Sequence, residues 1–227
     1  MSKKVFITGT GTDVGKTYVT GLIVKRLKEL GLNPAYYKAA MSGNDKDASG
    51  RLIPGDALFV KNTSRIDQPL ETMCPYIYER AVSPHLAARL EGEPVDIEVV
   101  KAGFDKLANE YDYITMEGSG GILCPIRKDD KTIFLEDLIK ELGLSCIVVA
   151  DAGLGTINSL VLTIEYMKGR GIDARAIIFN NYIKGDVMQE DNIAMCQELT
   201  GLKCLALVPK GAKDLDCDDE FLKSMYE

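Results

Sequence analysis

Five polar side chains stand at points in the sequence where a phosphate group could be bound and transferred. Lys16 and Thr17 close a glycine-rich segment, and Lys38, Asp56 and Glu117 follow at predicted strand ends or helix starts. An ammonium group stabilises phosphoryl charge, while hydroxyl and carboxylate oxygens are ligands that Mg²⁺ accepts. These residue types together predict phosphate chemistry assisted by a magnesium ion.

The glycine-rich segment has the composition of a phosphate-binding loop. Between a predicted strand and a predicted helix the chain reads Gly9-Thr10-Gly11-Thr12-Asp13-Val14-Gly15-Lys16-Thr17. Backbone N–H groups of such a loop converge on phosphate oxygens, and the helix N-terminus adds partial positive charge. Lys16 is expected to reach the terminal phosphates and the Thr17 hydroxyl to bind Mg²⁺. The loop is one residue longer than the usual G-x-x-x-x-G-K-[ST], because its first glycine is Gly9 rather than position 10.

Asp56 and Glu117 complete the predicted magnesium site. Glu117 ends an apolar strand and precedes Gly118-Ser119-Gly120-Gly121, so it stands in the place of a Walker-B acid. Together with Thr17, the two acids would supply the oxygen ligands that Mg²⁺ binds beside phosphate and water. Each acid also has a structural interpretation, because Asp is favoured at helix starts and acids are common at strand ends.

Further polar residues follow other predicted strands. Lys38 could offer a point charge to a phosphoryl group or an anionic substrate, although lysines at strand ends are often simply exposed. Asn180 and Asn181 could recognise a base through their amides, or could form a turn, which asparagine suits. The segment from Asp151 to Asn158 is a strand-to-helix turn whose helix N-terminus could hold a carboxylate.

Alternating strands and helices must position these residues. Apolar runs predict strands at 4–8, 34–39, 113–117, 146–151, 176–180 and 204–208. Helical spacing predicts helices at 16–30, 97–110, 134–142, 158–168 and 186–199, with short helices at 56–61 and 85–90. This order predicts an α/β fold of the P-loop NTPase type, a single domain over residues 1–227 with a mostly parallel sheet and helices on both faces. The acidic tail after Lys213 is expected to lie on the surface.

The composition is that of an ordinary globular protein. The chain has 227 residues, of which 46% are hydrophobic and 27% charged, and its formal net charge is −7. These values argue against disorder and against general nucleic-acid binding. No apolar run approaches the ~20 residues that span a bilayer, and the N-terminus lacks the pattern of a secretion signal. Six cysteines without C-x-x-C spacing and a single histidine predict a reduced, cytoplasmic protein without a zinc site.

The ordered motifs of the chain resemble those of the dethiobiotin synthetases over nearly its whole length. The longer loop G-T-x-T-x-V-G-K-T matches residues 9–17, Y-K-x-x-x-S-G matches residues 37–43, and E-G-x-G-G matches residues 117–121. The aspartate of the family's middle loop matches Asp56, and S-P-H matches residues 83–85. The unusual loop length and its companion motifs make this resemblance far more specific than a general P-loop match.

The resemblance implies an ATP- and Mg²⁺-dependent ring closure. Such enzymes take 7,8-diaminononanoate, CO₂ and ATP, and form dethiobiotin with release of ADP and phosphate. A carbamate on one amine attacks the γ-phosphate, and the second amine displaces phosphate from the resulting carbamic-phosphoric anhydride. The resemblance also implies a homodimer, with no membrane or nucleic-acid partner, in which Asn158 reaches the substrate carboxylate across the subunit interface.

The resemblance further assigns roles to individual residues. Lys16 and Lys38 would be the catalytic cations, and Thr17, Asp56 and Glu117 would hold Mg²⁺. Asn180 and Pro209 would lie beside the adenine. The substrate would be bound by Thr12, Lys38, Ser42, Gly120 and Asn158. The nucleotide would be bound by Thr12, Asp13, Val14, Gly15, Lys16, Thr17, Tyr18, Asp56, Glu117, Asn180, Asn181, Pro209, Lys210 and Gly211.

Some positions depart from the family pattern and leave nucleotide preference open. Asn181 stands where the family often has Asp, and Lys210-Gly211 stands where an aromatic residue can follow Pro209. The predicted helix around residues 191–197 lacks a tyrosine that some relatives place near the substrate. The tail from residue 214 to residue 227 matches no family motif.

Three other protein classes are weighed against this interpretation. An amidoligase resembling the cobyrinic acid amide synthases would need a glutaminase domain, for which 227 residues leave no room. A partner-switching ATPase of the ParA type would carry a second lysine in the loop, at the position of Gly11. A non-catalytic binding protein would not explain why lysines, acids and a threonine suited to phosphate chemistry occur together at predicted strand and helix ends.

Overall fold

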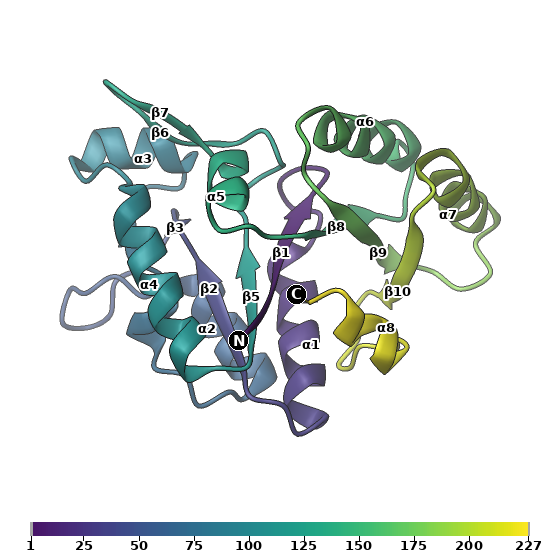
Figure 1. The fold of residues 1–227 in the computed structure, drawn as a ribbon, viewed down its shortest axis with the longest axis horizontal. Coiled ribbons are helices and arrows are strands. Elements are labelled where there is room, and N and C mark those ends of the chain that lie inside the picture. The colour runs from purple at the N-terminus through teal and green to yellow at the C-terminus, as the bar shows by residue number, and fades with distance from the viewer. Residues whose placement is uncertain (1, 227) are drawn as a thin grey trace.

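A six-stranded parallel sheet runs through the computed structural model, which describes residues 2–226 (Figure 1). Its strands lie in the order β10-β9-β8-β1-β5-β2, and each neighbouring pair is parallel. Parallel neighbours require crossover connections, which the helices supply. The carboxyl ends of all six strands therefore meet at one edge, where ligands bind in sheets of this kind.

The bounds of the elements follow the apolar periodicity of the sequence. The strands are β1 (Lys3–Gly9), β2 (Pro34–Lys38), β3 (Ala40–Met41), β4 (Tyr76–Ile77), β5 (Tyr113–Glu117), β6 (Pro125–Lys128), β7 (Thr132–Phe134), β8 (Cys146–Asp151), β9 (Ala174–Tyr182) and β10 (Lys203–Pro209). The helices are α1 (Lys16–Glu29), α2 (Gly55–Ser64), the 3₁₀ helix η1 (Leu70–Thr72), α3 (Pro84–Glu91), α4 (Ile97–Glu110), α5 (Leu135–Glu141), α6 (Thr156–Gly169), α7 (Val187–Thr200) and α8 (Asp219–Ser224). Within residues 2–226, no helix combines the length and apolar character needed to cross a membrane.

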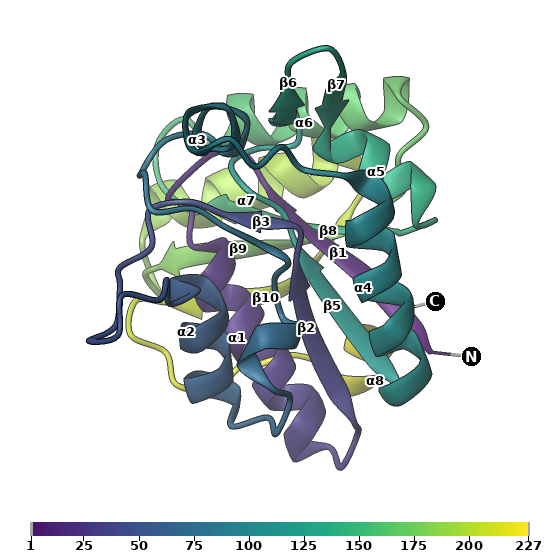
Figure 2. The ribbon, with the colours of Figure 1, turned by 90° about the vertical axis from the view of Figure 1, so that its left-hand side faces the viewer.

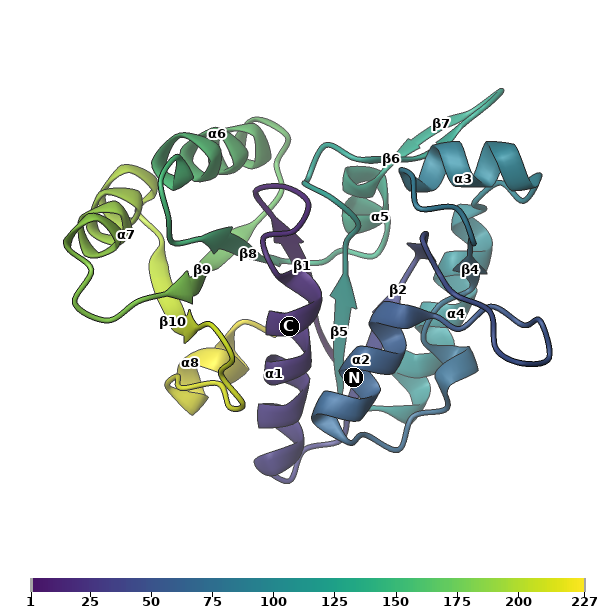
Figure 3. The same cartoon turned by 180° about the vertical axis from the view of Figure 1, so that it is seen from behind.

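Helices cover both faces of the sheet. Figure 2 shows the sheet between α1 and α2 on one side and α4 and α5 on the other, and Figure 3 shows α8 on the α1 side. The alternation of side chains along β1 explains the two cores. Val5 and Ile7 pack with α1 and α8, whereas Phe6 packs with α4 and α5 on the opposite face. Strands buried on both faces need apolar residues at nearly every position, as β8 has.

The predicted fold class and all predicted sheet strands are confirmed. The largest strand difference is at β9, which runs from Ala174 to Tyr182 rather than from residue 176 to residue 180. The sequence did not predict the two-residue pair β3–β4 or the antiparallel hairpin β6–β7. The hairpin was hidden because the chain from Arg127 to Lys131 is wholly charged, which is typical of a loop.

The expectation that the tail after Lys213 lies only on the surface is wrong. Its apolar side chains are buried in the core on the α1 face: Leu215, Leu222, Met225 and Tyr226. The hydroxyl of Tyr226 forms a 2.7 Å hydrogen bond with Oγ1 of Thr115 on β5. The acidic residues between these positions led to the prediction of a solvent-exposed segment. The apolar residues among them nevertheless allow one side of the segment to pack against the core.

Candidate active site

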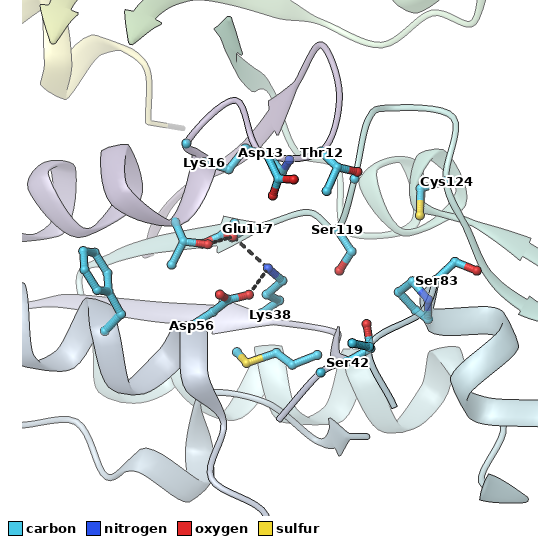
Figure 4. A pocket seen from close by; sticks show the side chains of 18 of the residues that line it. Thr12, Asp13, Lys16, Lys38, Ser42, Asp56, Ser83, Glu117, Ser119 and Cys124 are labelled. Carbon is cyan, nitrogen blue, oxygen red and sulfur yellow. Dashed lines mark hydrogen bonds and ion pairs between the residues drawn. The ribbon is translucent and has the colours of Figure 1, made fainter. Parts of the chain in front are cut away.

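A cavity of about 980 Å³ opens where β1, β2 and β5 end (Figure 4). Its walls come from the loop after β1, the starts of α1 and α2, and the segments that follow β2 and β5. The predicted site residues that line it are Thr12, Asp13, Gly15, Lys16, Thr17, Tyr18, Lys38, Ser42, Asp56, Glu117 and Gly120. Residues separated by up to about a hundred positions thus meet because parallel strands end at the same edge.

The loop between β1 and α1 is held in a phosphate-binding shape. Gly15 has a φ of +92°, a conformation that glycine adopts without strain, and it caps the N-terminus of α1. A Cβ atom at this position would lie 2.1 Å from Nδ2 of Asn180, so the close approach also requires glycine. Asn180 donates from Nδ2 to the carbonyl of Val14 at 3.0 Å. Lys16 folds back and donates to the carbonyl of Gly11 at 2.7 Å, which places its ammonium over the loop.

Four side chains form what we call the acid–lysine cluster: Thr17, Lys38, Asp56 and Glu117. Lys38 Nζ donates to Oδ2 of Asp56 at 2.5 Å and to Oε1 of Glu117 at 2.8 Å. Thr17 Oγ1 donates to the same Glu117 oxygen at 2.7 Å. Figure 4 shows Lys38 lying between the two carboxylates at the floor of the cavity. The cluster therefore links α1, β2 and β5 through the Glu117 carboxylate, and Lys38 joins α2 to them through Asp56.

Strand register explains why Lys38 and Glu117 meet. β2 and β5 are parallel neighbours, and Lys38 is paired with Glu117 at their carboxyl ends. Both strands are buried throughout, so the two charged residues end apolar runs at the first position that opens to the cavity. Their side chains remain almost fully covered, 6% exposed for Lys38 and 0% for Glu117. Charges buried this deeply are stable only when they are paired, as they are here.

The charges of the cavity act on each other. Burial lowers the pKa of Lys38, but the negative charges of Glu117 and Asp56 outweigh burial and hold this pKa above its usual range. Burial raises the pKa of Asp56, but the attraction of Lys38 prevails and lowers it. Lys16 differs, because burial and the neighbouring charge of Lys38 lower its pKa to about 8. Lys38 thus stays a cation, whereas Lys16 without a bound anion is protonated below about pH 8 and loses its proton above it.

The acid–lysine cluster offers the ligands that a magnesium ion requires. Thr17, Asp56 and Glu117 present one hydroxyl and two carboxylates, all hard oxygen donors, around one point. The ammonium of Lys38 stands at that point, so the carboxylates already surround a positive charge. Phosphate oxygens and water would complete the coordination, as is usual for Mg²⁺ beside a nucleotide. The residues present therefore fit Mg²⁺.

A second set of predicted residues lies at the ends of β9 and β10, outside the cavity lining. Asn181 has a φ of +58° and donates from Nδ2 to Oδ2 of Asp151 at 2.7 Å. Pro209 ends β10 and pairs with Tyr182. The loop that follows, with Lys210 and Gly211, approaches α1, where the hydroxyl of Tyr18 donates to the carbonyl of Ala212. Asn180 connects this set to the phosphate loop through its bond to Val14.

Asn158 lies apart from both sets. It is an exposed residue in the first turns of α6, and it does not line the cavity. The interface role that the family resemblance gives it would require a second copy of the chain.

Sequence reasoning missed several residues of the cavity. Met41, Phe59, Val82, Pro84 and Cys124 form apolar parts of its wall. Met41 lies within the Y-K-x-x-x-S-G motif and Pro84 within the S-P-H motif, so both belong to segments that the sequence had singled out. Their residue types, however, gave no indication of contact with a ligand. Burial raises the pKa of the Cys124 thiol, although Lys16 and Lys38 lower it in part.

Tyr36 was also missed, although it touches the acid–lysine cluster directly. Its hydroxyl donates to Oε2 of Glu117 at 3.1 Å. Burial and then the charge of Glu117 raise the pKa of Tyr36, so the hydroxyl keeps its proton and acts as a donor. The available signal was strand alternation, which puts Tyr36 on the same face of β2 as Lys38.

Comparison with solved structures supports the assignment of the fold. A chain of the MinC:MinD cell division protein complex of Aquifex aeolicus has a TM-score of 0.57 and 16% identity, and the match covers 99% of this chain and 86% of that one. MinD of the same organism, solved alone, has a TM-score of 0.55 and 14% identity over 99% and 87% of the two chains. At such low identity the likeness concerns the fold only. The fold and the cavity together define a P-loop nucleotide-binding protein of the α/β class.

Sequence comparison then identifies the family. A family model described as an AAA domain matches residues 3–214. The ATP-dependent dethiobiotin synthetase of Brachyspira hyodysenteriae is 46% identical over 100% of both chains. That of Clostridium novyi is 46% identical over 92% of this chain and 88% of its own length. The chain belongs to the dethiobiotin synthetase family, which confirms the resemblance found in its motifs.

Proposed function

We propose that this chain joins 7,8-diaminononanoate and CO₂ into the ureido ring of dethiobiotin, with hydrolysis of ATP to ADP and phosphate. The reaction would pass through a carbamate and a carbamic-phosphoric anhydride. The observation that carries the proposal is the acid–lysine cluster below the phosphate loop, with Lys38 between Asp56 and Glu117. Full-length identity to named dethiobiotin synthetases supplies the substrate class.

The two lysines would divide the electrostatic work. Lys16 lies over the phosphate loop, where it would neutralise the β- and γ-phosphates. Lys38 is held at the cavity floor by two carboxylates, from where its ammonium would stabilise the carbamate and the charge that develops as the phosphoryl group moves. No side chain needs to form a covalent bond, because the carbamate oxygen is itself the nucleophile.

Thr17, Asp56 and Glu117 would hold Mg²⁺ when the nucleotide is bound. The ion would neutralise phosphate charge and orient the terminal phosphates. Lys38 would then share its carboxylate partners with a second cation, and its ammonium would turn toward the anionic substrate. β2 and β5 hold Lys38 and Glu117 opposite each other at their carboxyl ends.

The remaining predicted residues would bind the diamine substrate and the base of the nucleotide. Thr12, Ser42 and Gly120 lie in the cavity lining, where they would position the diamine. Beyond the P-loop residues themselves, the nucleotide base would lie near Asn180, Asn181 and the loop from Pro209 to Gly211. Proximity to the phosphate loop supports this placement, because Asn180 bonds to Val14 and Tyr18 bonds to Ala212.

A homodimer would bring Asn158 to the substrate of the second subunit. The surface near Asn158 supports a partner, because large apolar side chains are exposed there. Leu154 is 89% exposed directly before α6, Val187 is 81% exposed at the start of α7, and α6 packs beside α7 (Figure 1). Exposed apolar residues gathered on neighbouring elements are typical of protein interfaces.

Residues 1–227 would act as one catalytic unit in the cytoplasm. The six cysteines are all free, which suits a reducing compartment. The six-stranded sheet positions both the phosphate loop and the acid–lysine cluster, so the residues of the proposed chemistry would lie in one unit.

The decisive experiment measures phosphate release from MgATP and bicarbonate with and without 7,8-diaminononanoate, together with product mass. We expect phosphate release to depend on the diamine and to equal the dethiobiotin formed. A nonanoate with only one amine is the matched control, because it can form a carbamate but cannot close the ring. Equal phosphate release with and without the diamine, or release without dethiobiotin, would contradict the proposal.

A further inference from the structure

Tyr36 is the only hydroxyl donor recorded on Oε2 of Glu117 within residues 2–226. It stands in the middle of β2, its side chain is fully buried, and its ring packs with α1 and α2 residues such as Val24 and Val60. From there its hydroxyl reaches Oε2 of Glu117 at 3.1 Å. Glu117 itself is only 1% exposed, so little of its carboxylate is open to water that could replace this bond.

The two oxygens of Glu117 have different partners. Oε1 accepts from Thr17 at 2.7 Å and from Lys38 at 2.8 Å, so it faces the proposed metal and phosphate side. Oε2 accepts from Tyr36 on the side of the core. A carboxylate held from both sides cannot rotate without breaking a bond at each oxygen. The orientation of Glu117 is therefore set by Tyr36 as well as by the residues of the cluster.

The neighbouring residue Tyr37 shows that burial of a tyrosine on β2 does not by itself produce this contact. Tyr37 points to the opposite face of the sheet, where its hydroxyl donates to the carbonyl of Val100 on α4 at 2.9 Å. It packs edge-to-face on Phe104 and is also buried. Tyr36 shares a face with Lys38 because strand side chains alternate, whereas Tyr37 does not.

We propose that Tyr36 is a positioning residue, whose hydroxyl orients the Glu117 carboxylate so that Oε1 is presented to Mg²⁺ and to Lys38. The proposal rests on the proposed function, because it assigns Glu117 to the metal. Hydrogen-bond partners behind a metal ligand fix its orientation, and their loss commonly costs 10- to 100-fold in metal affinity. Without the hydroxyl, Oε2 would be left unpaired in the core, and the carboxylate would turn to find another donor.

The test compares Tyr36→Phe with Tyr37→Phe. Each change removes one buried, hydrogen-bonded hydroxyl from adjacent positions and keeps the ring, so both should lower thermal stability to a similar extent. Mn²⁺ replaces Mg²⁺ as the probe, and its binding to the complex with a non-hydrolysable ATP analogue is measured by electron paramagnetic resonance. We expect Tyr36→Phe to weaken Mn²⁺ binding by about tenfold, and Tyr37→Phe to leave it unchanged.

A double-mutant cycle shows whether Tyr36 acts through Glu117. In a Glu117→Gln background, the loss of the Tyr36 hydroxyl should not weaken Mn²⁺ binding further, because the oriented carboxylate is already absent. An equal loss in both backgrounds, or equal Mn²⁺ affinities of Tyr36→Phe and Tyr37→Phe, would overturn the proposal. The Mn²⁺ measurement needs no turnover. A wild-type protein that binds Mn²⁺ but makes no dethiobiotin would therefore refute the proposed reaction without deciding the role of Tyr36.

Discussion

The two halves of the sheet end in different chemistry. At the ends of β1, β2 and β5, charged side chains are buried and paired with each other, as Lys38 is with Asp56 and Glu117. At the ends of β8 and β9, neutral amides predominate and bond mainly to backbone or to one acid, as Asn180 and Asn181 do. The second half exposes Leu154 and Val187 beside α6 and α7, where the proposed homodimer would place its second subunit.

If the proposed function holds, catalysis takes place in one half of the sheet and assembly of the homodimer in the other. A buried ion cluster is stable only with every partner in place, so the β2–β5 half must be organised before ligands arrive. Exposed apolar residues carry no such requirement, so the β8–β10 half could fold before the proposed second subunit binds. The following predictions test whether the halves differ in this way.

The largest expected effect comes from replacing Lys38. Lys38→Met removes a preorganised cation from the reacting groups and should lower kcat by about 100- to 1,000-fold. Lys101→Met, on the exposed face of α4, is the matched control and should keep full activity. Steady-state kinetics and a thermal melt of both variants provide the measurement. A stable Lys38→Met variant with normal kcat would remove Lys38 from the mechanism.

The next effect concerns the exposed apolar side chains beside α6 and α7. Leu154→Asp combined with Val187→Asp should weaken self-association by about 100-fold, because a charge replaces an apolar contact at the proposed interface. Leu90→Asp, on α3, changes an exposed leucine elsewhere and should leave association unchanged. Light scattering after size exclusion gives the oligomeric state. If the double variant associates like the wild type, α6 and α7 do not form the interface.

A substitution of Thr17 tests the proposed magnesium site at the ends of β1, β2 and β5. Thr17→Val should weaken MgATP binding by about 10- to 100-fold while leaving metal-free ATP binding nearly unchanged, because only the hydroxyl is lost. Thr20→Val is the control on the same helix, since its buried hydroxyl has no hydrogen-bond partner among residues 2–226. Calorimetric titrations with Mg²⁺ and with EDTA separate the two cases. An equal loss in both conditions would show that Thr17 contacts phosphate rather than metal.

The smallest effect is a pH dependence that distinguishes the two lysines. Burial and then Lys38 lower the pKa of Lys16 to about 8, so free Lys16 is protonated below this pH and neutral above it. Phosphate binding requires the protonated form, and ATP affinity in EDTA should therefore fall above pH 8, by at most about tenfold per pH unit. In Lys38→Met the repulsion is gone, which raises the pKa of Lys16 and moves the fall to higher pH. Calorimetry between pH 7 and pH 9.5 would detect the shift, and an affinity independent of pH would contradict it.

Much of the charged half could be predicted from the sequence. Lys38 and Glu117 each end a short apolar run, and the parallel arrangement of such strands brings their ends together. The contact of Tyr36 with Glu117 was not predictable, because it depends on the register of β2 against β5 and on the reach of a side chain across two strands. Alternation indicates the face on which Tyr36 lies but not the atom that it meets.

The apolar half and the tail were harder to predict for a different reason. Leu154 and Val187 have the same residue types as core positions, and only the three-dimensional structure shows that they are exposed. In the tail, acids dominate the composition, while Leu222 and Tyr226 are buried. Residue polarity therefore gave the wrong environment for the tail and no prediction for Leu154 and Val187, because exposure is decided by which elements pack nearby.

The buried tail has a consequence for synthesis of the protein on the ribosome. Every strand of the sheet precedes residues 215–226 in the chain, yet these residues cover the β1 and β5 core through Leu222 and Tyr226. While the tail is still inside the exit tunnel, that apolar surface stays open to solvent and to chaperones. Strands β1, β2, β5 and β8 can therefore pair during translation, but the α1 face of the sheet closes only after α8 has emerged.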